Sequence, residues 1–227
     1  MQSFQGRVSH IQLWGGRQVV RIACAQKMIP APGKYTLAWA EGDADAPLAT
    51  PLFATQIDPD GFLAAPGAPL HWGPGTRLHL RGPLGRGFSL PAATRRLALA
   101  ALDGEVARLQ PLVQAALERQ ASVALFVDGF VPQLPTAVEV APLSGLVEAL
   151  KWADFIAVDL SRHKLPHLSE LLGREPLPCP GQALVSAEMP CGGIAECGAC
   201  SLKTRQGWKL ACKDGPVFDL SDLQEGM

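Results

Sequence analysis

Four of the six cysteines in this 227-residue chain lie between positions 191 and 212, and no other sequence feature restricts the fold as strongly. Cys191, Cys197, Cys200 and Cys212 form the pattern Cys-x5-Cys-x2-Cys-x11-Cys. The first residues of the chain lack the basic and apolar stretch of a secretory signal, so the clustered cysteines indicate metal ligation in a reducing compartment rather than disulfides. We therefore predict that these four thiolates bind one metal centre.

The residues between the cysteines favour a [2Fe-2S] cluster as the metal centre. Such a cluster takes four thiolates, two for each iron, and is stabilised by backbone N–H groups that point at sulfur. Small residues that allow a close approach of the backbone occupy much of the loop: Gly192, Gly193, Ala195, Gly198 and Ala199. Structural zinc sites usually combine two Cys-x2-Cys-like pairs, whereas only Cys197 and Cys200 have that spacing here. A zinc-stapled interaction module without redox activity is the alternative.

The chain divides into three regions with different patterns of apolar residues. Residues 1–92 contain short apolar runs separated by turn residues, which predicts an antiparallel β-barrel. Residues 93–178 alternate apolar runs with helical stretches at 105–119, 143–152 and 165–172, the pattern of a parallel α/β sheet, with Asp103 as a helix N-cap. Residues 179–227 hold the cysteines and little regular structure. We predict a multi-domain α+β chain with these three parts.

Composition and motifs exclude several functional classes. Hydrophobic residues make up 48% of the chain, and 20 Lys and Arg balance 21 Asp and Glu, so we expect no binding to nucleic acid or to an anionic membrane. The sequence has no apolar run of about 18 residues, and we expect a cytoplasmic protein. It also lacks a Gly-x-Ser-x-Gly motif and a Walker-type lysine loop, so hydrolysis and phosphoryl transfer have no support.

Three motifs around the cysteines carry a family resemblance: Met189-Pro190-Cys191-Gly192, Cys197-Gly198-Ala199-Cys200 and Cys212-Lys213-Asp214-Gly215-Pro216-Val217-Phe218. They resemble the cluster loop and the chain ending of dihydroorotate dehydrogenase electron transfer subunits, in the ferredoxin reductase-like superfamily. Upstream, Pro30-Ala31-Pro32-Gly33-Lys34-Tyr35 and Gly82-Pro83-Leu84-Gly85-Arg86-Gly87-Phe88 are also similar to family segments. The family usually has four residues, and this chain five, between the first two ligands.

The resemblance implies a barrel that holds FAD, a sheet that receives NAD(H) and a cluster that passes electrons to a catalytic partner subunit in a hetero-oligomer. In the family, a glycine-rich turn after the first strand of the sheet cradles the pyrophosphate of NAD. Here that turn is Leu102-Asp103-Gly104-Glu105, with one glycine and two carboxylates. Carboxylates repel a diphosphate, so we expect residues 93–178 to be a degenerate nucleotide-binding domain without NAD.

The FAD motif of the family is an Arg-Pro-aromatic-Ser/Thr run in the barrel. The matching residues here, which the resemblance implies as FAD contacts, are Thr50, Pro51, Leu52 and Phe53. The arginine and the hydroxyl are missing at their positions, so a phosphate clamp would have to come from Arg81 or Arg86. Two versions follow: a relay from FAD to the cluster, and a flavin-free scaffold that carries the cluster alone.

We predict an iron–sulfur electron-transfer subunit that relays electrons, through FAD or without it, to or from a partner oxidoreductase. A dihydroorotate dehydrogenase-like catalytic subunit is the partner that the resemblance implies. We assign no catalytic residue, in keeping with a component of an oxidoreductase complex rather than a stand-alone enzyme.

Overall fold

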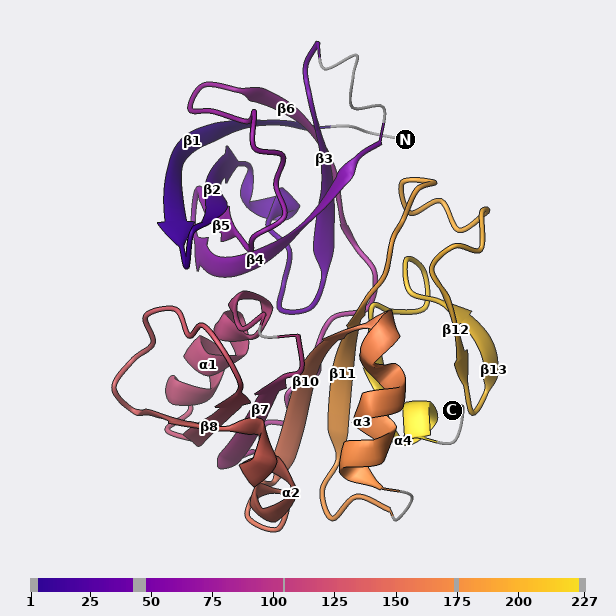
Figure 1. The fold of residues 1–227 in the computed structure, drawn as a ribbon. Helices are drawn as coiled ribbons and strands as arrows, with labels where there is room; N and C mark the ends of the chain where they lie inside the picture. The colour runs from indigo at the N-terminus through magenta and orange to yellow at the C-terminus, as the bar shows by residue number, and fades with distance from the viewer. Residues whose placement is uncertain (1–3, 43–47, 104, 174–175, 225–227) are drawn as a thin grey trace.

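A six-stranded antiparallel barrel forms the N-terminal part of the chain (Figure 1). The computed structural model describes residues 4–42, 48–103, 105–173 and 176–224. The barrel strands have the order β1-β2-β5-β4-β3-β6, and β6 pairs with β1 to close the barrel. Their bounds are β1 (Phe4–Trp14), β2 (Arg17–Cys24), β3 (Tyr35–Ala40), β4 (Thr50–Asp58), β5 (Gly61–Ala64) and β6 (Arg77–Leu84), with the short helix η1 (Gln26–Met28) after β2. Alternating inward side chains such as Ile22, Phe62 and Leu80 fill its core.

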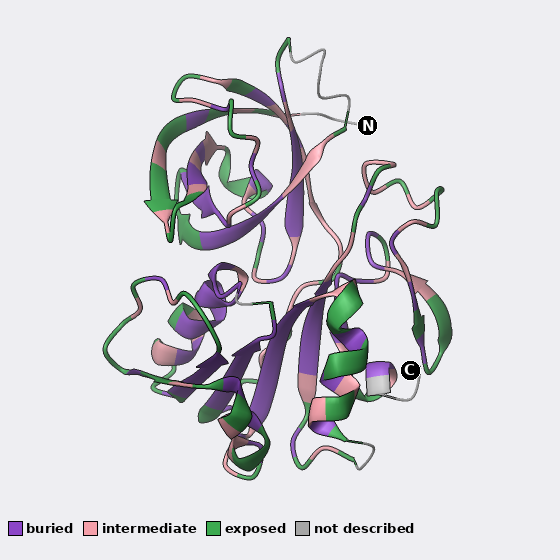
Figure 2. Cartoon of the chain, in the orientation of Figure 1, coloured by how far each residue is buried: buried purple, intermediate pink, exposed green. Residues whose placement is uncertain are grey.

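The second part is a six-stranded sheet of order β14-β11-β10-β7-β8-β9. Its parallel strands are β7 (Arg96–Ala101), β8 (Ser122–Val127), β9 (Val138–Ala141), β10 (Phe155–Ser161) and β11 (Gly181–Ser186), and β14 (Val217–Asp219) is an antiparallel edge. Figure 2 shows that β7, β8 and β10 are buried along almost their whole length. This fits their nearly continuous apolar sequences, because helices cover both faces of such a sheet. The predicted combination of barrel and parallel sheet is confirmed.

Helices on the two faces of the sheet are short. One face is covered by η2 (Ala107–Leu109) and α1 (Gln110–Leu117). The other face is covered by η3 (Leu143–Gly145), α2 (Leu146–Ala149), η4 (Arg162–Lys164), α3 (Leu165–Leu172) and α4 (Leu220–Gln224). The helix expected over 165–172 is present and ends at Gly173, which has a φ of 71°. The longer helices expected over 105–119 and 143–152 each consist of a 3-10 turn and a shorter α-helix.

Asp103 does not cap a helix, contrary to the sequence prediction. Its carboxylate accepts a hydrogen bond from the backbone N–H of Ser161, so it connects the end of β7 to the end of β10. Gly104, the glycine of the same turn, lies outside the described residues. The carboxylate of Asp103 therefore binds a residue on another strand, 58 positions away in sequence, and not the N-terminus of the next helix, as the local sequence pattern predicted.

The C-terminal region packs against both other parts. Between β11 and β14 the chain forms the cysteine loop, defined here as residues 187–200, and then a hairpin of β12 (Ser201–Thr204) and β13 (Gly207–Leu210). In Figure 1 this hairpin lies beside α3 and α4, and the loop extends toward the barrel. The region therefore contains more regular structure than expected. No helix in the described part of the chain has the length and apolar character needed to span a bilayer.

Candidate iron–sulfur site

The four predicted ligands lie on two neighbouring segments of the C-terminal region. Cys191, Cys197 and Cys200 belong to the cysteine loop, and Cys212 follows β13. The N–H of Ala211 donates to the carbonyl of Cys200 at 3.1 Å, which joins the two segments. Cys200 and Cys212 are buried, whereas Cys191 is half-buried and Cys197 is exposed. The candidate site therefore has a protected side and a side open to solvent.

The cysteine side chains interact in two pairs. The Cys197 thiol hydrogen-bonds to the sulfur of Cys191, and Cys200 and Cys212 share a second hydrogen bond. All six cysteines, each of them in the described part of the chain, are free thiols. The described residues contain no group of three or more His, Cys, Asp or Glu side chains arranged to hold one metal ion. Two pairs of thiols fit the ligand set of a [2Fe-2S] cluster, which has two thiolates for each iron.

Backbone N–H groups point at the sulfurs on the exposed side. Burial raises the pKa of the Cys191 thiol, but the Cys197 thiol and the N–H groups of Glu196, Cys197 and Ile194 outweigh it and lower the pKa to about 6. The N–H of Ala199 donates to the sulfur of Cys197 at 3.4 Å. These donors stabilise thiolates, the form that binds iron.

The buried side behaves differently, because burial and the neighbouring thiol of Cys200 raise the pKa of Cys212 to about 12. Cys212 is therefore a neutral thiol when no metal is bound. Metal binding releases the proton of such a ligand, so binding at Cys212 is coupled to deprotonation.

Left-handed backbone conformations shape the cysteine loop. Gly192, Gly193 and Gly198 have φ angles of 61°, 69° and 71°, as the sequence predicted for a loop that turns its N–H groups toward sulfur. Ala195 also has a positive φ, 66°, although it carries a Cβ atom. For a residue with a Cβ atom, such a conformation costs energy and persists where surrounding contacts hold it. The conformation of Ala195 therefore indicates that the loop is constrained.

Three side chains from outside the C-terminal region hold the segments that carry the predicted ligands. The hydroxyl of Tyr35, on β3, donates to the carbonyl of Cys212 at 2.9 Å. Arg81, on β6, donates to the carbonyl of Gly192 at 2.6 Å, and Arg162 donates to the carbonyl of Ala199 at 2.6 Å. Sequence reasoning missed Tyr35 and Arg162. The signal available for Tyr35 was that a lone tyrosine in an apolar barrel strand needs a partner for its hydroxyl.

The substitute phosphate clamp expected from Arg81 or Arg86 stays a prediction. Arg81 binds the cysteine loop, and Arg86 forms an ion pair with Asp219 at 2.9 Å. Both guanidinium groups thus bind groups of the chain itself, Arg81 at the cysteine loop and Arg86 at β14.

The FAD contacts that the resemblance implies border a small cavity between barrel and sheet. Thr50, Pro51 and Phe53 line a volume of about 190 Å³, whereas Leu52 is buried in the barrel core. Ligand sites in proteins usually measure roughly 300–1,000 Å³. Met189, just before the first cysteine, also lines the cavity, so the cavity adjoins the cysteine loop.

The charges around this cavity do not fit the diphosphate of FAD. Arg108 lines it, but its guanidinium binds the carboxylate of Asp159 with two hydrogen bonds of 2.7 and 2.5 Å. Burial raises the pKa of Asp159 to about 6, although Arg108 acts to lower it. Glu105 accepts the N–H of Ala107 and pairs with Arg17 across the gap between sheet and barrel. The described residues at this site thus offer no unpaired cation to a phosphate group.

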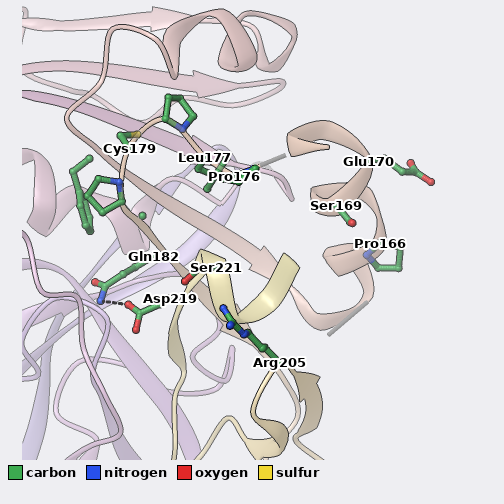
Figure 3. Close-up of a pocket in the computed structure, with 14 residues that line it drawn as sticks. Pro166, Ser169, Glu170, Pro176, Leu177, Cys179, Gln182, Arg205, Asp219 and Ser221 are labelled. Atoms are coloured by element: carbon green, nitrogen blue, oxygen red, sulfur yellow. Dashed lines mark hydrogen bonds between the residues drawn. The ribbon is translucent and has the colours of Figure 1, made fainter. Parts of the chain in front are cut away.

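A larger cavity, about 1,130 Å³ and shown in Figure 3, lies near the start of β11, whereas the cysteine loop follows the end of that strand. Prolines of the connector before β11 line it together with Glu170, Arg205 and Asp219. Asp219 is already hydrogen-bonded to Gln182, as Figure 3 shows. Cys179, at its edge, is a buried thiol whose pKa is raised by that burial. This cavity therefore has no part in the candidate iron–sulfur site.

Comparison with known proteins supports the assignment of the C-terminal region. Residues 187–224 match the family described as the iron–sulfur cluster binding domain of dihydroorotate dehydrogenase B. The chain is 26% identical over 175 residues to the electron transfer subunit of dihydroorotate dehydrogenase B (NAD(+)) from Desulforamulus reducens, covering 64% of each chain. A stretch of 35 residues is 51% identical to sulfhydrogenase 1 subunit gamma from Pyrococcus furiosus, covering 15% of this chain and 12% of that one. The chain thus spans less than two thirds of these curated relatives.

Solved structures show the same overall fold. The NADH-dependent reduced ferredoxin-NADP oxidoreductase superposes with a TM-score of 0.71 at 17% identity, covering 98% of this chain and 90% of that chain. The ferredoxin reductase of carbazole 1,9a-dioxygenase gives 0.63 at 16% identity, covering 78% and 67%. The resemblance seen in the sequence motifs is confirmed: this chain has a ferredoxin reductase-like fold, and its C-terminal segment matches the iron–sulfur cluster binding domain of dihydroorotate dehydrogenase B.

Proposed function

We propose that this chain is an iron–sulfur electron-transfer subunit in which Cys191, Cys197, Cys200 and Cys212 hold a [2Fe-2S] cluster. The observation that carries the proposal is the pairing of the thiols, Cys191 with Cys197 and Cys200 with Cys212. Each pair supplies the two thiolates that one iron requires. The backbone N–H groups directed at Cys191 and Cys197 add the hydrogen bonds that such a centre needs.

The cluster, when bound, accepts and donates one electron at a time. The buried Cys200 and Cys212 hold it on the protein side, where Tyr35 fixes the backbone of Cys212. The exposed Cys197 marks the side from which an electron donor or acceptor approaches. Residues of this chain therefore position the cluster and shield one side of it, and the partner supplies the reaction.

The partner in this proposal is a catalytic oxidoreductase subunit, such as a dihydroorotate dehydrogenase-like one, in a hetero-oligomer. The support is that the Desulforamulus relative is named as an electron transfer subunit. A cytoplasmic location and the division into domains 1–92, 93–178 and 179–227 belong to the same proposal. Co-purification of the tagged full chain from its native cells would identify the partner.

The flavin content separates two versions of the relay. The cavity lined by Thr50, Pro51 and Phe53 adjoins the cysteine loop, which favours a flavin-bearing version. The pairing of Arg108 with Asp159 leaves no phosphate clamp there, which favours a flavin-free version.

The proposal is tested by anaerobic purification of the full chain, followed by metal, sulfide and acid-extracted flavin analysis and visible spectra before and after dithionite. We expect about two irons per chain and charge-transfer bands that bleach on reduction. One zinc and no iron would instead identify a zinc-stapled module and overturn the redox function. Bound FAD in the same sample would select the flavin-bearing version.

The individual ligands are tested by single substitutions. We expect Cys191→Ser and Cys212→Ser to lose most of the iron and the visible bands, because each removes one of the four thiolates. Cys24→Ser and Cys179→Ser are matched controls, since Cys24 ends β2 and Cys179 precedes β11, outside both ligand-bearing segments, and they should keep the wild-type iron content. Loss of iron in the controls but not in the ligand variants would refute the ligand assignment.

A further inference from the structure

Arg81 connects the barrel to the cysteine loop. Its Nη2 atom donates to the carbonyl of Gly192 at 2.6 Å. A Cβ atom placed on Gly193 would lie 3.6 Å from the same nitrogen and 2.9 Å from the Tyr35 hydroxyl. Tyr35 is also close enough to three proposed ligands to feel their charge: Cys191, Cys200 and Cys212. The guanidinium of Arg81 therefore lies beside the region where the four thiolates would meet.

Arg81 brings a positive charge that no carboxylate of the described residues pairs with. By contrast, Arg77 on the same strand pairs with Glu41, and Arg86 pairs with Asp219. The Nε atom of Arg81 is buried and has no hydrogen-bond partner among the described residues. Arg81 is half-buried and arginine stays protonated, so its charge is partly removed from water and an opposite charge nearby would stabilise it. A centre built from four thiolates would provide that opposite charge.

We propose that Arg81 is a positioning residue for the cluster, and that its guanidinium both fixes the loop at Gly192 and offsets the negative charge of the thiolate centre. The inference rests on the proposed iron–sulfur function. Reduction adds one electron, and hence one negative charge, to a centre that is already anionic. A nearby cation stabilises the reduced form more than the oxidised form, so Arg81 raises the reduction potential.

The test compares Arg81→Met, Arg81→Lys and Arg77→Met in the full chain. Each protein is reduced in steps under anaerobic conditions, the reduced cluster is quantified by electron paramagnetic resonance, and iron and sulfide are measured in parallel. We expect Arg81→Met to change the ratio of reduced to oxidised cluster by about tenfold toward oxidised at a fixed potential, a shift of about 59 mV for one electron. Arg81→Lys, which keeps the charge, should recover most of the shift, and Arg77→Met should match the wild type.

Two results would overturn the role of Arg81. One is a wild-type potential in Arg81→Met at full iron content, and the other is an equal shift in Arg77→Met, which would show a general effect of surface charge. If Arg81→Met fails to hold the cluster, the Arg81→Lys variant tests the charge effect instead. A cluster that Arg81→Lys retains, with a near-wild-type potential, supports the charge effect, and loss of the cluster in Arg81→Lys as well refutes it. Failure of the proposed function is distinguishable, because the wild-type chain would then contain no iron.

Discussion

The hydrogen bond from Tyr35 to Cys212 can be removed with little other change by the substitution Tyr35→Phe. The ring is fully buried and packs 5.8 Å from the ring of Phe53, and phenylalanine keeps both features. Only the 2.9 Å bond from the hydroxyl to the carbonyl of Cys212 disappears. A buried carbonyl that loses its donor costs about 1–3 kcal/mol, so we expect the free energy of unfolding to fall by that amount.

The barrel offers a matched control for this substitution. Thr36 is also fully buried, and its hydroxyl donates to the carbonyl of Met28 at 2.8 Å, within the barrel. Thr36→Val should therefore lower the free energy of unfolding by a similar amount. The two variants should differ in the cluster, because only Tyr35 contacts the segment that carries a proposed ligand.

The assay combines urea unfolding with the rate at which an iron chelator removes metal from the folded protein, both under anaerobic conditions. We expect both variants to be destabilised and only Tyr35→Phe to release iron faster than the wild type. Equal release rates in the two variants would refute the view that the barrel holds the cluster segment through this bond. So would a Tyr35→Phe variant that releases iron as slowly as the wild type.

Three further predictions concern the buried ion pair, its pH dependence and the loop glycines. Arg108→Met leaves the fully buried carboxylate of Asp159 without its cation, and we expect urea unfolding at pH 7 to show that the free energy of unfolding falls by about 3–5 kcal/mol. The double variant with Asp159→Leu should recover most of this stability. A double variant as unstable as the single one would contradict this. Burial raises the pKa of Asp159 from 3.8 to about 6, so its contribution to stability is complete below pH 3.8 and is lost as the pH rises through 6. The urea concentration at the unfolding midpoint should therefore be higher at pH 5 than at pH 7. An Asp159→Leu variant should lack this difference. Gly193→Ala and Gly192→Ala both force alanine into a left-handed conformation, which costs about 1–2 kcal/mol. Of the two, the new Cβ would meet the Tyr35 hydroxyl, at 2.9 Å, only at Gly193. Iron content should therefore fall further in Gly193→Ala, and equal losses would show that the contact is unimportant.

The sequence predicted those parts of the molecule that local patterns determine. Short apolar runs between turn residues predicted the barrel, and continuous apolar runs predicted the buried strands β7, β8 and β10. The glycines of the cysteine loop predicted its left-handed conformations, because only residues without a Cβ adopt them without strain. The ligand assignment also depends on local spacing, and it stays a prediction until iron is measured.

Contacts between segments far apart in the chain were beyond the reach of the sequence. Tyr35 and Cys212 are 177 positions apart, and Arg81 and Gly192 are 111 positions apart. A phosphate clamp is expected from Arg81 because the arginine of the FAD motif is missing at its position, whereas in the fold Arg81 donates to the carbonyl of Gly192. Asp103 is expected to cap a helix because it precedes a helical stretch, but its partner, Ser161, lies on another strand.

The distribution of charge differs between the proposed cluster site and the cavity beside the barrel. Beside the cysteine loop, Arg81 and Arg162 bring positive charge, and N–H groups point at sulfur, which stabilises a centre of four thiolates. Beside the barrel cavity, the charge of Arg108 is matched by Asp159, and the field of further carboxylates opposes a diphosphate. The surroundings of the cysteine loop thus favour an anionic thiolate centre, whereas those of the barrel cavity oppose a diphosphate, and each effect comes from its own set of charged residues. Substituting the cations of the loop should therefore change the cluster without affecting the cavity, and freeing Arg108 from Asp159 should create anion affinity there without changing the cluster.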